Sequence, residues 1–155
     1  MTPITAPQFD FKQGGTKLCI VKPDVGLSTP EVFKALKYDE LSDADPEELL
    51  KRFVEDGVII KGGGEEGEDK YVNDLEGPAF RCLPELGRLK VELMDERWGF
   101  DTVMMSGSGT SIFCMGEPND ADEFRRTFID DRDGLSVFFA DFISREGEDG
   151  WFQRR

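Results

Sequence analysis

Short apolar runs bounded by turn residues divide the chain into four predicted strands. The first spans Lys17 to Lys22 and stops at Pro23, and its unbroken apolar centre predicts burial on both faces. Two further runs, Asp101 to Met105 and Ser111 to Met115, flank a short loop and therefore predict a β-hairpin. The last run, Leu135 to Ile143, alternates well enough to be the final strand.

Apolar residues at helical spacing predict helices between these strands. Ser28 or Thr29 can cap a helix that has Pro30 at its first position, and Asp43 to Glu48 repeats this start signal for a second helix. The predicted apolar side comprises Val32, Phe33 and Leu36 in the first helix, and Leu49, Leu50, Phe53 and Val54 in the second.

Three more helical segments are predicted further along. Asn73 or Asp74 can cap a helical region, Leu83 to Met94 continues as a helix behind Pro84, and Asp120 to Thr127 forms a polar helix. The residues that face inward in the last two are Leu86, Leu89, Leu93 and Met94, then Phe124 and Phe128. At the start of the helical region that Asn73 or Asp74 can cap, Asp74 and Glu76 can either act on a substrate or cap the helix, and we expect capping.

The order strand, helices, two strands, helix, strand is typical of an α+β sandwich, in which helices cover one face of an antiparallel sheet. We expect one domain over residues 17–143, after an irregular arm at 1–16 and before a polar tail at 144–155. Within the domain, the glycine-rich acidic segment 61–70 is expected to be a mobile, solvated loop. The alternative for this loop is a metal site formed by Glu65, Glu66, Glu68 and Asp69.

Charge and composition exclude several classes of function. The 155 residues include 19 Lys and Arg against 33 Asp and Glu, so the formal net charge is −14. Such a charge repels nucleic acids and anionic membrane surfaces, and we expect neither as a partner. There is no histidine, which rules out Ser-His-Asp and Cys-His catalysis within this chain.

The cysteines and the apolar content indicate in which cellular compartment the protein is expected. Cys19, Cys82 and Cys114 are widely spaced among apolar residues, so we expect reduced core residues and a reducing compartment. No run approaches the roughly 18 apolar residues of a membrane span, and residues 1–15 carry no signal-peptide pattern. We therefore expect neither a membrane segment nor a targeting segment.

The hairpin loop carries unusual chemistry, because Ser106, Gly107, Ser108, Gly109 and Thr110 consist only of glycine and hydroxyl residues. Its glycines allow positive φ and lack the Cβ atoms that keep a ligand from the main chain, so the loop can cradle a phosphate. A plain tight turn uses the same residues and stays open as the alternative. The loop is not a Walker-type P-loop, because it lacks the lysine after the second glycine.

The sequence contains three separated motif blocks, Val21 to Phe33, Val72 to Phe80 and Met105 to Phe113. Together they resemble the C-terminal domain of the GHMP kinase superfamily, and more narrowly its kinases of 4-diphosphocytidyl-2-C-methyl-D-erythritol. The segment Phe142 to Glu146, with Trp151, most resembles the plant and algal kinases of this group. The resemblance covers about residues 17 to 152 and implies a ferredoxin-like fold. It also implies that Ser106 to Thr110 approach the phosphate end of the active site, and that Pro30 and Phe33 lie beside the cytosine.

The activity that this resemblance implies is transfer of the ATP γ-phosphoryl group to the substrate's 2-hydroxyl, in non-mevalonate isoprenoid biosynthesis. ATP and Mg²⁺ would be bound mainly by an N-terminal domain, and the partners would be a small cytidine diphosphate substrate and that N-terminal domain. The implied location is the plastid stroma for a plant or alga, and otherwise the bacterial cytoplasm.

The sequence also departs from the family, since nothing in residues 1–16 matches its ATP-binding loop or its catalytic residues. We therefore expect no catalytic residue and no metal ligand in this chain, which would be inactive alone. It would be the C-terminal part of the kinase, from a truncated gene model, a split enzyme or an excised domain. The alternative is a noncatalytic binding or regulatory module of the same fold.

Overall fold

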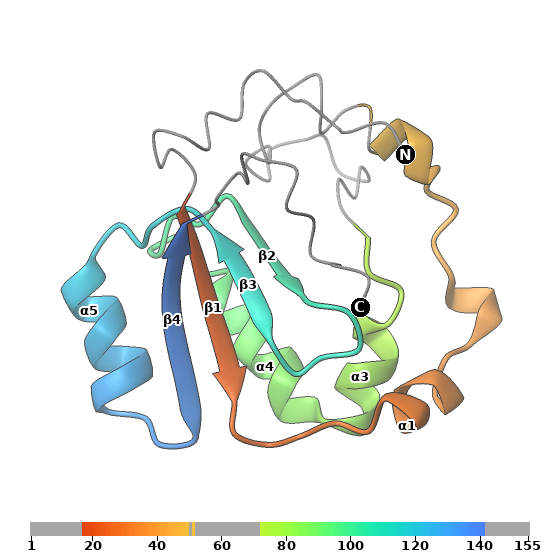
Figure 1. The fold of residues 1–155 in the computed structure, drawn as a ribbon, viewed down its shortest axis with the longest axis horizontal. Coiled ribbons are helices and arrows are strands. Elements are labelled where there is room, and N and C mark those ends of the chain that lie inside the picture. Colours follow the sequence, from red (N-terminus) through yellow and green to blue (C-terminus); the bar gives the residue numbers. More distant parts are fainter. Residues whose placement is uncertain (1–16, 50, 52–71, 142–155) are drawn as a thin grey trace, which may run out of the picture.

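The computed structural model describes residues 17–49, 51 and 72–141 (Figure 1). The predictions for the arm 1–16, the loop 61–70 and the tail 144–155 lie outside these residues, as do those for Leu50, Phe53 and Val54. The second predicted helix begins as expected, because residues 46–49 are helical and Asp45 Oδ1 accepts a hydrogen bond from the Glu47 amide at 2.8 Å.

Four strands form one antiparallel sheet in the order β2-β3-β1-β4 (Figure 1). Their bounds are Lys17–Pro23 for β1, Thr102–Met105 for β2, Ile112–Met115 for β3 and Leu135–Asp141 for β4. Helical segments separate β1 from β2 and β3 from β4 along the chain, which gives the ferredoxin-like topology. The predicted α+β fold with one antiparallel sheet is therefore confirmed.

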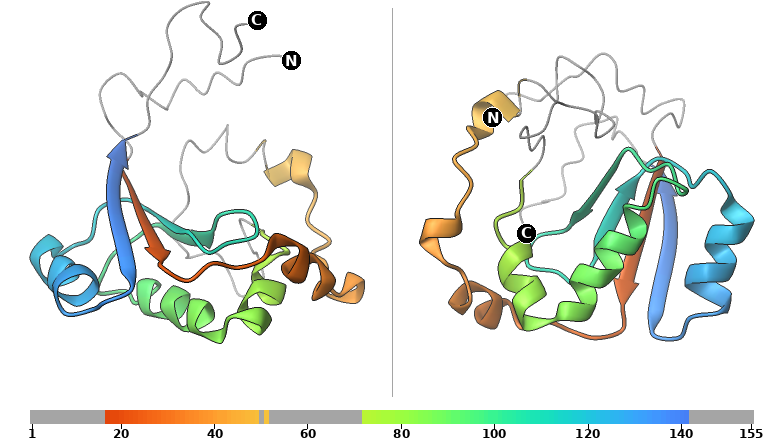
Figure 2. Two further views of the ribbon diagram at one scale, coloured as in Figure 1. Left: turned by 60° about the horizontal axis from the view of Figure 1, so that its bottom comes forward. Right: turned by 180° about the vertical axis from the view of Figure 1, so that it is seen from behind.

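The central strand β1 is buried on only one face. Cys19 and Val21 are fully buried, whereas Leu18 and Ile20 on the opposite face are half-buried. The prediction that this strand is buried on both faces is wrong. The reason is the layering seen in Figure 2, where α3 and α4 lie together on one face of the sheet.

Between β1 and β2 the described chain contains α1 (Thr29–Lys34), the 3₁₀ turn η2 (Tyr38–Glu40), α3 (Glu76–Cys82) and α4 (Pro84–Leu93). The break between α3 and α4 falls at Leu83, where φ is −138°, because a residue before proline is disfavoured in the α region. Leu86, Leu89 and Leu93 are buried as predicted. Met94 is exposed, contrary to prediction, because the helix ends before it.

Aromatic residues form the packed end of the core. Asp120 caps α5 (Ala121–Arg125) through a hydrogen bond from the Glu123 amide at 2.8 Å, and the π-helical turn η3 (Arg126–Asp130) follows. Phe124 and Phe128 are fully buried, as predicted. Both rings contact buried Trp98, at centroid distances of 5.1 Å and 5.4 Å.

The three cysteines are free, but they do not share one environment. Cys19 and Cys114 face each other across β1 and β3 and are buried, which raises the pKa of the Cys19 thiol to about 12. Cys82 is exposed at the end of α3, so its predicted place in the core is wrong.

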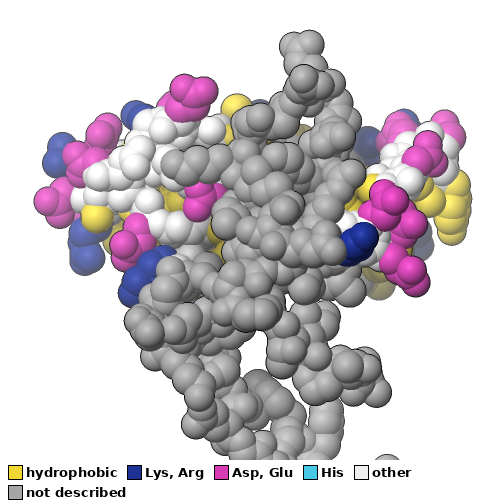
Figure 3. Space-filling view, turned by 90° about the horizontal axis from the view of Figure 1, so that it is seen from above, with side chains coloured by type: hydrophobic (Ala, Val, Ile, Leu, Met, Phe, Trp, Pro, Cys, Tyr) yellow, Lys and Arg dark blue, Asp and Glu magenta, His cyan; other side chains and the backbone are white. Residues whose placement is uncertain are grey.

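On the face seen in Figure 3, acidic and basic side chains of the described residues are intermixed at both ends of the molecule. An ion pair links the neighbouring strands β1 and β4, where Lys17 Nζ lies 2.8 Å from Asp141 Oδ1. Among the described residues, no helix has the length and apolar character needed to cross a membrane.

Candidate functional site

The loop between β2 and β3 turns the chain back in a hairpin, as the apolar pattern predicted. The Ser106 amide donates to the Ser111 carbonyl at 2.8 Å, and the Gly109 amide donates to the Ser106 carbonyl at 3.0 Å. Gly107 and Gly109 adopt φ values of 56° and 88°. The expectation that these glycines supply a left-handed backbone is therefore confirmed.

Two of the three loop hydroxyls are engaged with the segment that leads from β1 into α1. Thr110 is buried, and its Oγ1 donates to the Val25 carbonyl at 3.1 Å. The Ser108 and Thr29 hydroxyls form a hydrogen bond of 2.9 Å. These contacts place the start of α1 directly against the glycine loop.

The loop also presents main-chain donors. Within the part of the chain that the structure describes, the amides of Gly107 and Ser108 donate to no acceptor. Consecutive amides of this kind can bind an anion when the local backbone lets them point the same way. The geometry is therefore compatible with a phosphate ligand at this loop.

The two glycines leave space in different directions. A Cβ atom at Gly107 would meet nothing within 4 Å. A Cβ atom at Gly109 would lie 2.9 Å from Met105 Sδ and 3.4 Å from Leu86 Cδ2, inside the core. The expectation that a missing side chain opens the main chain to a ligand therefore suits Gly107, whereas Gly109 is required by packing.

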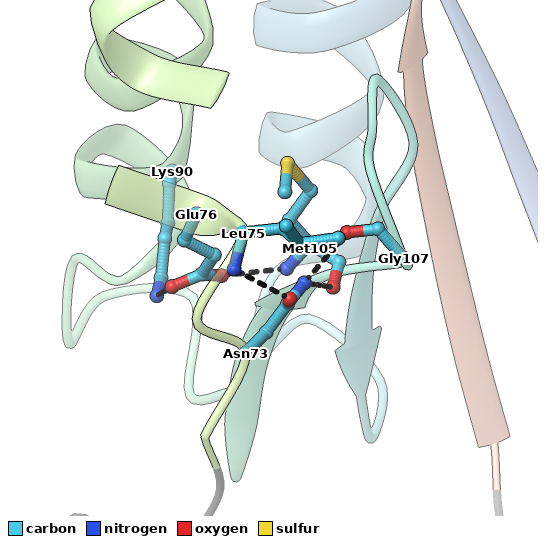
Figure 4. A network of polar contacts seen from close by, with 6 residues as sticks. All are labelled: Asn73, Leu75, Glu76, Lys90, Met105 and Gly107. Carbon is cyan, nitrogen blue, oxygen red and sulfur yellow. Dashed lines mark hydrogen bonds and ion pairs between the residues drawn. The ribbon is translucent and has the colours of Figure 1, made fainter. Parts of the chain in front are cut away.

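Asn73 holds the start of this loop (Figure 4). Its Nδ2 donates to the Met105 carbonyl at 2.8 Å and to the Gly107 carbonyl at 2.9 Å, while its Oδ1 accepts from the Leu75 amide at 3.1 Å. All the hydrogen-bonding groups of the side-chain amide are thus used, except for one lone pair.

Glu76 contacts the same strand end from the first turn of α3. Its Oε1 accepts from the Met105 amide at 2.8 Å, and its Oε2 lies 2.5 Å from Lys90 Nζ on α4 (Figure 4). The Glu76 and Lys90 side chains are only 16% and 19% exposed. An ion pair so shielded from water orients the carboxylate toward Met105.

The expectation that Asp74 and Glu76 cap the helix is wrong. The residue at the N-cap of α3 is Leu75, and no side chain caps it. Asp74 Oδ1 instead accepts from the Ser42 amide at 2.9 Å, and Glu76 reaches across to β2. Both carboxylates therefore accept from backbone amides that are about thirty positions away in the sequence, and neither accepts from an amide of the first turn of α3.

The first helix also differs in part from its prediction. Ser28 is the N-cap residue of α1, as one of the two predicted options, but its side chain makes no capping bond. Val32 is fully buried, whereas Phe33 is 55% exposed and Pro30 is exposed as well. Spacing assigned Phe33 to the core side of the helix, and the structure places it at the surface.

A cavity of about 280 Å³ lies beside Asn73, between η2 and the pair α3 and α4. Five of its charged lining residues pair with one another: Glu40 accepts from Lys37 at 2.6 Å and from Arg81 at 2.8 Å, and Glu76 accepts from Lys90. The hydrogen bonds from Lys37 and Arg81 hold the pKa of the Glu40 carboxyl below its ordinary value.

Sequence reasoning missed the roles of Asn73, Glu76 and Lys90 at the loop. A signal was present, since Asn73 and Glu76 lie in one of the three blocks that carry the resemblance. Lys90 gave no signal, because a lysine in a polar helix face is ordinary.

No family model matches the chain. The chloroplastic 4-diphosphocytidyl-2-C-methyl-D-erythritol kinase of Oryza sativa is 36% identical over 143 residues, covering 88% of this chain and 31% of the relative. The kinase of that name from Protochlamydia amoebophila is 44% identical over 101 residues, covering 65% and 29%. The chain is homologous to the C-terminal part of the 4-diphosphocytidyl-2-C-methyl-D-erythritol kinases.

A solved structure of a 4-(cytidine 5'-diphospho)-2C-methyl-D-erythritol kinase supports the same relationship. The two structures superpose with a TM-score of 0.54 at 27% identity, and the match covers 79% of this chain and 42% of the solved chain. The resemblance to the GHMP kinase family and its fold is thus confirmed. The chain spans about a third of the length of the curated kinases it matches.

Proposed function

We propose that this chain is the C-terminal part of a kinase that transfers the ATP γ-phosphoryl group to the 2-hydroxyl of 4-diphosphocytidyl-2-C-methyl-D-erythritol. The observation that carries the proposal is the glycine loop, whose Gly107 and Ser108 amides lack acceptors among the described residues. Homology to kinases of this name supports that substrate. The reaction would serve non-mevalonate isoprenoid biosynthesis, in a chloroplast or a bacterial cell, as the names and sources of the relatives suggest.

In this proposal the chain supplies phosphate positioning and the rest of the kinase supplies most of the nucleotide site. The residues present fit a phosphate, because the Gly107 and Ser108 amides, which have no acceptor among the described residues, can donate to an anion. Mg²⁺ and ATP would be held mainly by the N-terminal region, as the relationship to ATP-dependent kinases implies.

The test is turnover with ATP, Mg²⁺ and the cytidine substrate, measured for the chain alone and with the N-terminal region of the rice relative added as a separate polypeptide. We expect no turnover alone and measurable turnover with the added region. Turnover by the chain alone would contradict the division of labour. Substrate binding without turnover in either mixture would favour a noncatalytic module.

We further propose that Phe33 and Pro30 form the cytosine side of this site. Both are exposed on α1, and the hydroxyl of its first residue, Thr29, forms a hydrogen bond with the Ser108 hydroxyl of the loop. A flat, exposed ring on the helix that contacts a phosphate loop can stack on the base of a cytidine diphosphate. The surface position of Phe33 supports this role over a structural one.

The Phe33→Ala variant should raise the KM for the cytidine substrate about tenfold, because stacking on one aromatic is worth about 1–3 kcal/mol. The KM for ATP and the Tm should change little. A matched control is Phe138→Ala, since Phe138 is 54% exposed but lies on β4, away from the loop. An unchanged KM in the Phe33 variant, or an equal rise in the control, would remove Phe33 from the site.

A further inference from the structure

We propose that Asn73 is a positioning residue that aims the Ser108 amide at a phosphate group of the ligand. This inference rests on the proposed function, because it assigns a cause to the phosphate contact assumed there. Asn73 itself does not touch the ligand in this proposal. It acts through the two carbonyl groups that it holds, those of Met105 and Gly107.

The argument starts from peptide geometry. In a planar trans peptide, the carbonyl group of one residue and the amide N–H of the next point in opposite directions. The Met105 carbonyl accepts from Asn73, and the Ser106 amide of the same peptide accordingly points to β3, where it donates to the Ser111 carbonyl. The first peptide of the loop therefore behaves as this geometry requires.

The same rule applies to the peptide that joins Gly107 to Ser108, which is trans. Its carbonyl accepts from Asn73 at 2.9 Å, so its N–H is directed away from Asn73. Within the described residues this N–H has no acceptor. A single side chain thus fixes the direction of a donor that no group in the described fold uses.

Other hydrogen bonds fix Asn73 and the strand end that it holds. The Leu75 amide fixes the Asn73 side chain by donating to Oδ1, which sets the direction of both N–H bonds of Nδ2. Glu76 holds the Met105 amide, so the last residue of β2 is fixed at both its N–H and its carbonyl. A glycine such as Gly107 can adopt many backbone conformations. The hydrogen bond from Asn73 to its carbonyl restricts it to one of them before a ligand binds.

The test uses the full ¹⁵N-labelled chain titrated with inorganic pyrophosphate, observing the Ser108 amide resonance. The main variant is Asn73→Asp, which keeps the Oδ1 acceptor for Leu75 and removes both donors to the carbonyls. We expect the Ser108 resonance of the wild type to shift on binding. In the variant the dissociation constant should rise about tenfold or more, as for a lost hydrogen bond to a charged group.

The matched control is Asp74→Asn, the opposite exchange at the neighbouring position, where the side chain contacts Ser42 and not the loop. It should bind pyrophosphate like the wild type. Asn73→Ser serves as a second variant, because its hydroxyl can still accept from the Leu75 amide. Weak binding in both Asn73 variants with otherwise unchanged spectra would support the proposal.

Three outcomes would overturn it: wild-type affinity in a folded Asn73 variant, unfolding of both variants, or a wild-type Ser108 amide that does not respond to pyrophosphate. The last outcome is distinct from failure of the proposed function. Turnover after addition of the N-terminal region would then keep the kinase assignment while removing Asn73 from it.

Discussion

The two ends of the β2–β3 hairpin are held by different kinds of interaction. At the end that enters β2, Trp98 packs against Phe124 and Phe128 in the core, and all three rings are fully buried. At the loop end, Asn73 and Glu76 hold the backbone by hydrogen bonds, and much of the loop is partly or fully exposed.

This difference shows how one hairpin can be both anchored and available for binding. Aromatic packing gains free energy from burial and leaves no group free for a ligand. Hydrogen bonds to the backbone fix the direction of peptide groups while leaving their other side open. Perturbing each end separately should therefore affect stability at one end and loop geometry at the other.

The largest effect is expected from Trp98→Ala at the packed end. Removing this fully buried ring should lower the free energy of unfolding by about 3–5 kcal/mol. Urea denaturation measures the loss, and Val91→Ala on the exposed side of α4 is the control, expected to stay within about 0.5 kcal/mol of the wild type. Equal losses in both variants would contradict the aromatic anchor.

At the loop end, Glu76→Ala should cost about 1–3 kcal/mol, since it leaves the Met105 amide and the shielded Lys90 without their partner. Hydrogen exchange at the Met105 amide should accelerate in this variant. Combined with Trp98→Ala, the two losses should add within about 0.5 kcal/mol if the ends are independent. A larger coupling would mean that the hairpin transmits strain along its length.

A smaller effect separates the two loop glycines. Both have positive φ, which costs an alanine about 1–2 kcal/mol, but only Gly109 would also place its Cβ against Met105 and Leu86. Gly109→Ala should therefore be less stable than Gly107→Ala by about 1 kcal/mol in urea denaturation. The reverse order would show that the loop relaxes away from the core.

The last prediction requires no change in stability, because it concerns the reactivity of the cysteine thiols. It tests the burial of Cys114 on β3 and of its neighbour Cys19 on β1. Burial raises the pKa of Cys19 to about 12, so at pH 8 its thiol stays protonated and unreactive, and buried Cys114 is shielded as well. A thiol reagent should modify Cys82 alone in the folded chain and all three cysteines in urea. Equal rates for the three in the folded chain would contradict the buried pair.

Apolar spacing predicted the packed end and missed the polar end for a physical reason. Phe124 and Phe128 repeat at helical spacing, so one face of α5 and η3 could be read from the sequence. Asn73 and Glu76 bond to residues about thirty positions away, and no periodicity encodes such a contact. Phe33 was misplaced because a helix of six residues has too few positions to define a buried side.

The pairing of β1 has a consequence for the order in which the protein can form during synthesis. Of the described strands, β1 leaves the ribosome first, yet its neighbours β3 and β4 are made last. Until then the nascent chain carries a strand with two unpaired edges, which other chains can contact. The sheet closes only when Asp141 arrives beside Lys17, so folding should be a single late event and not a strand-by-strand process.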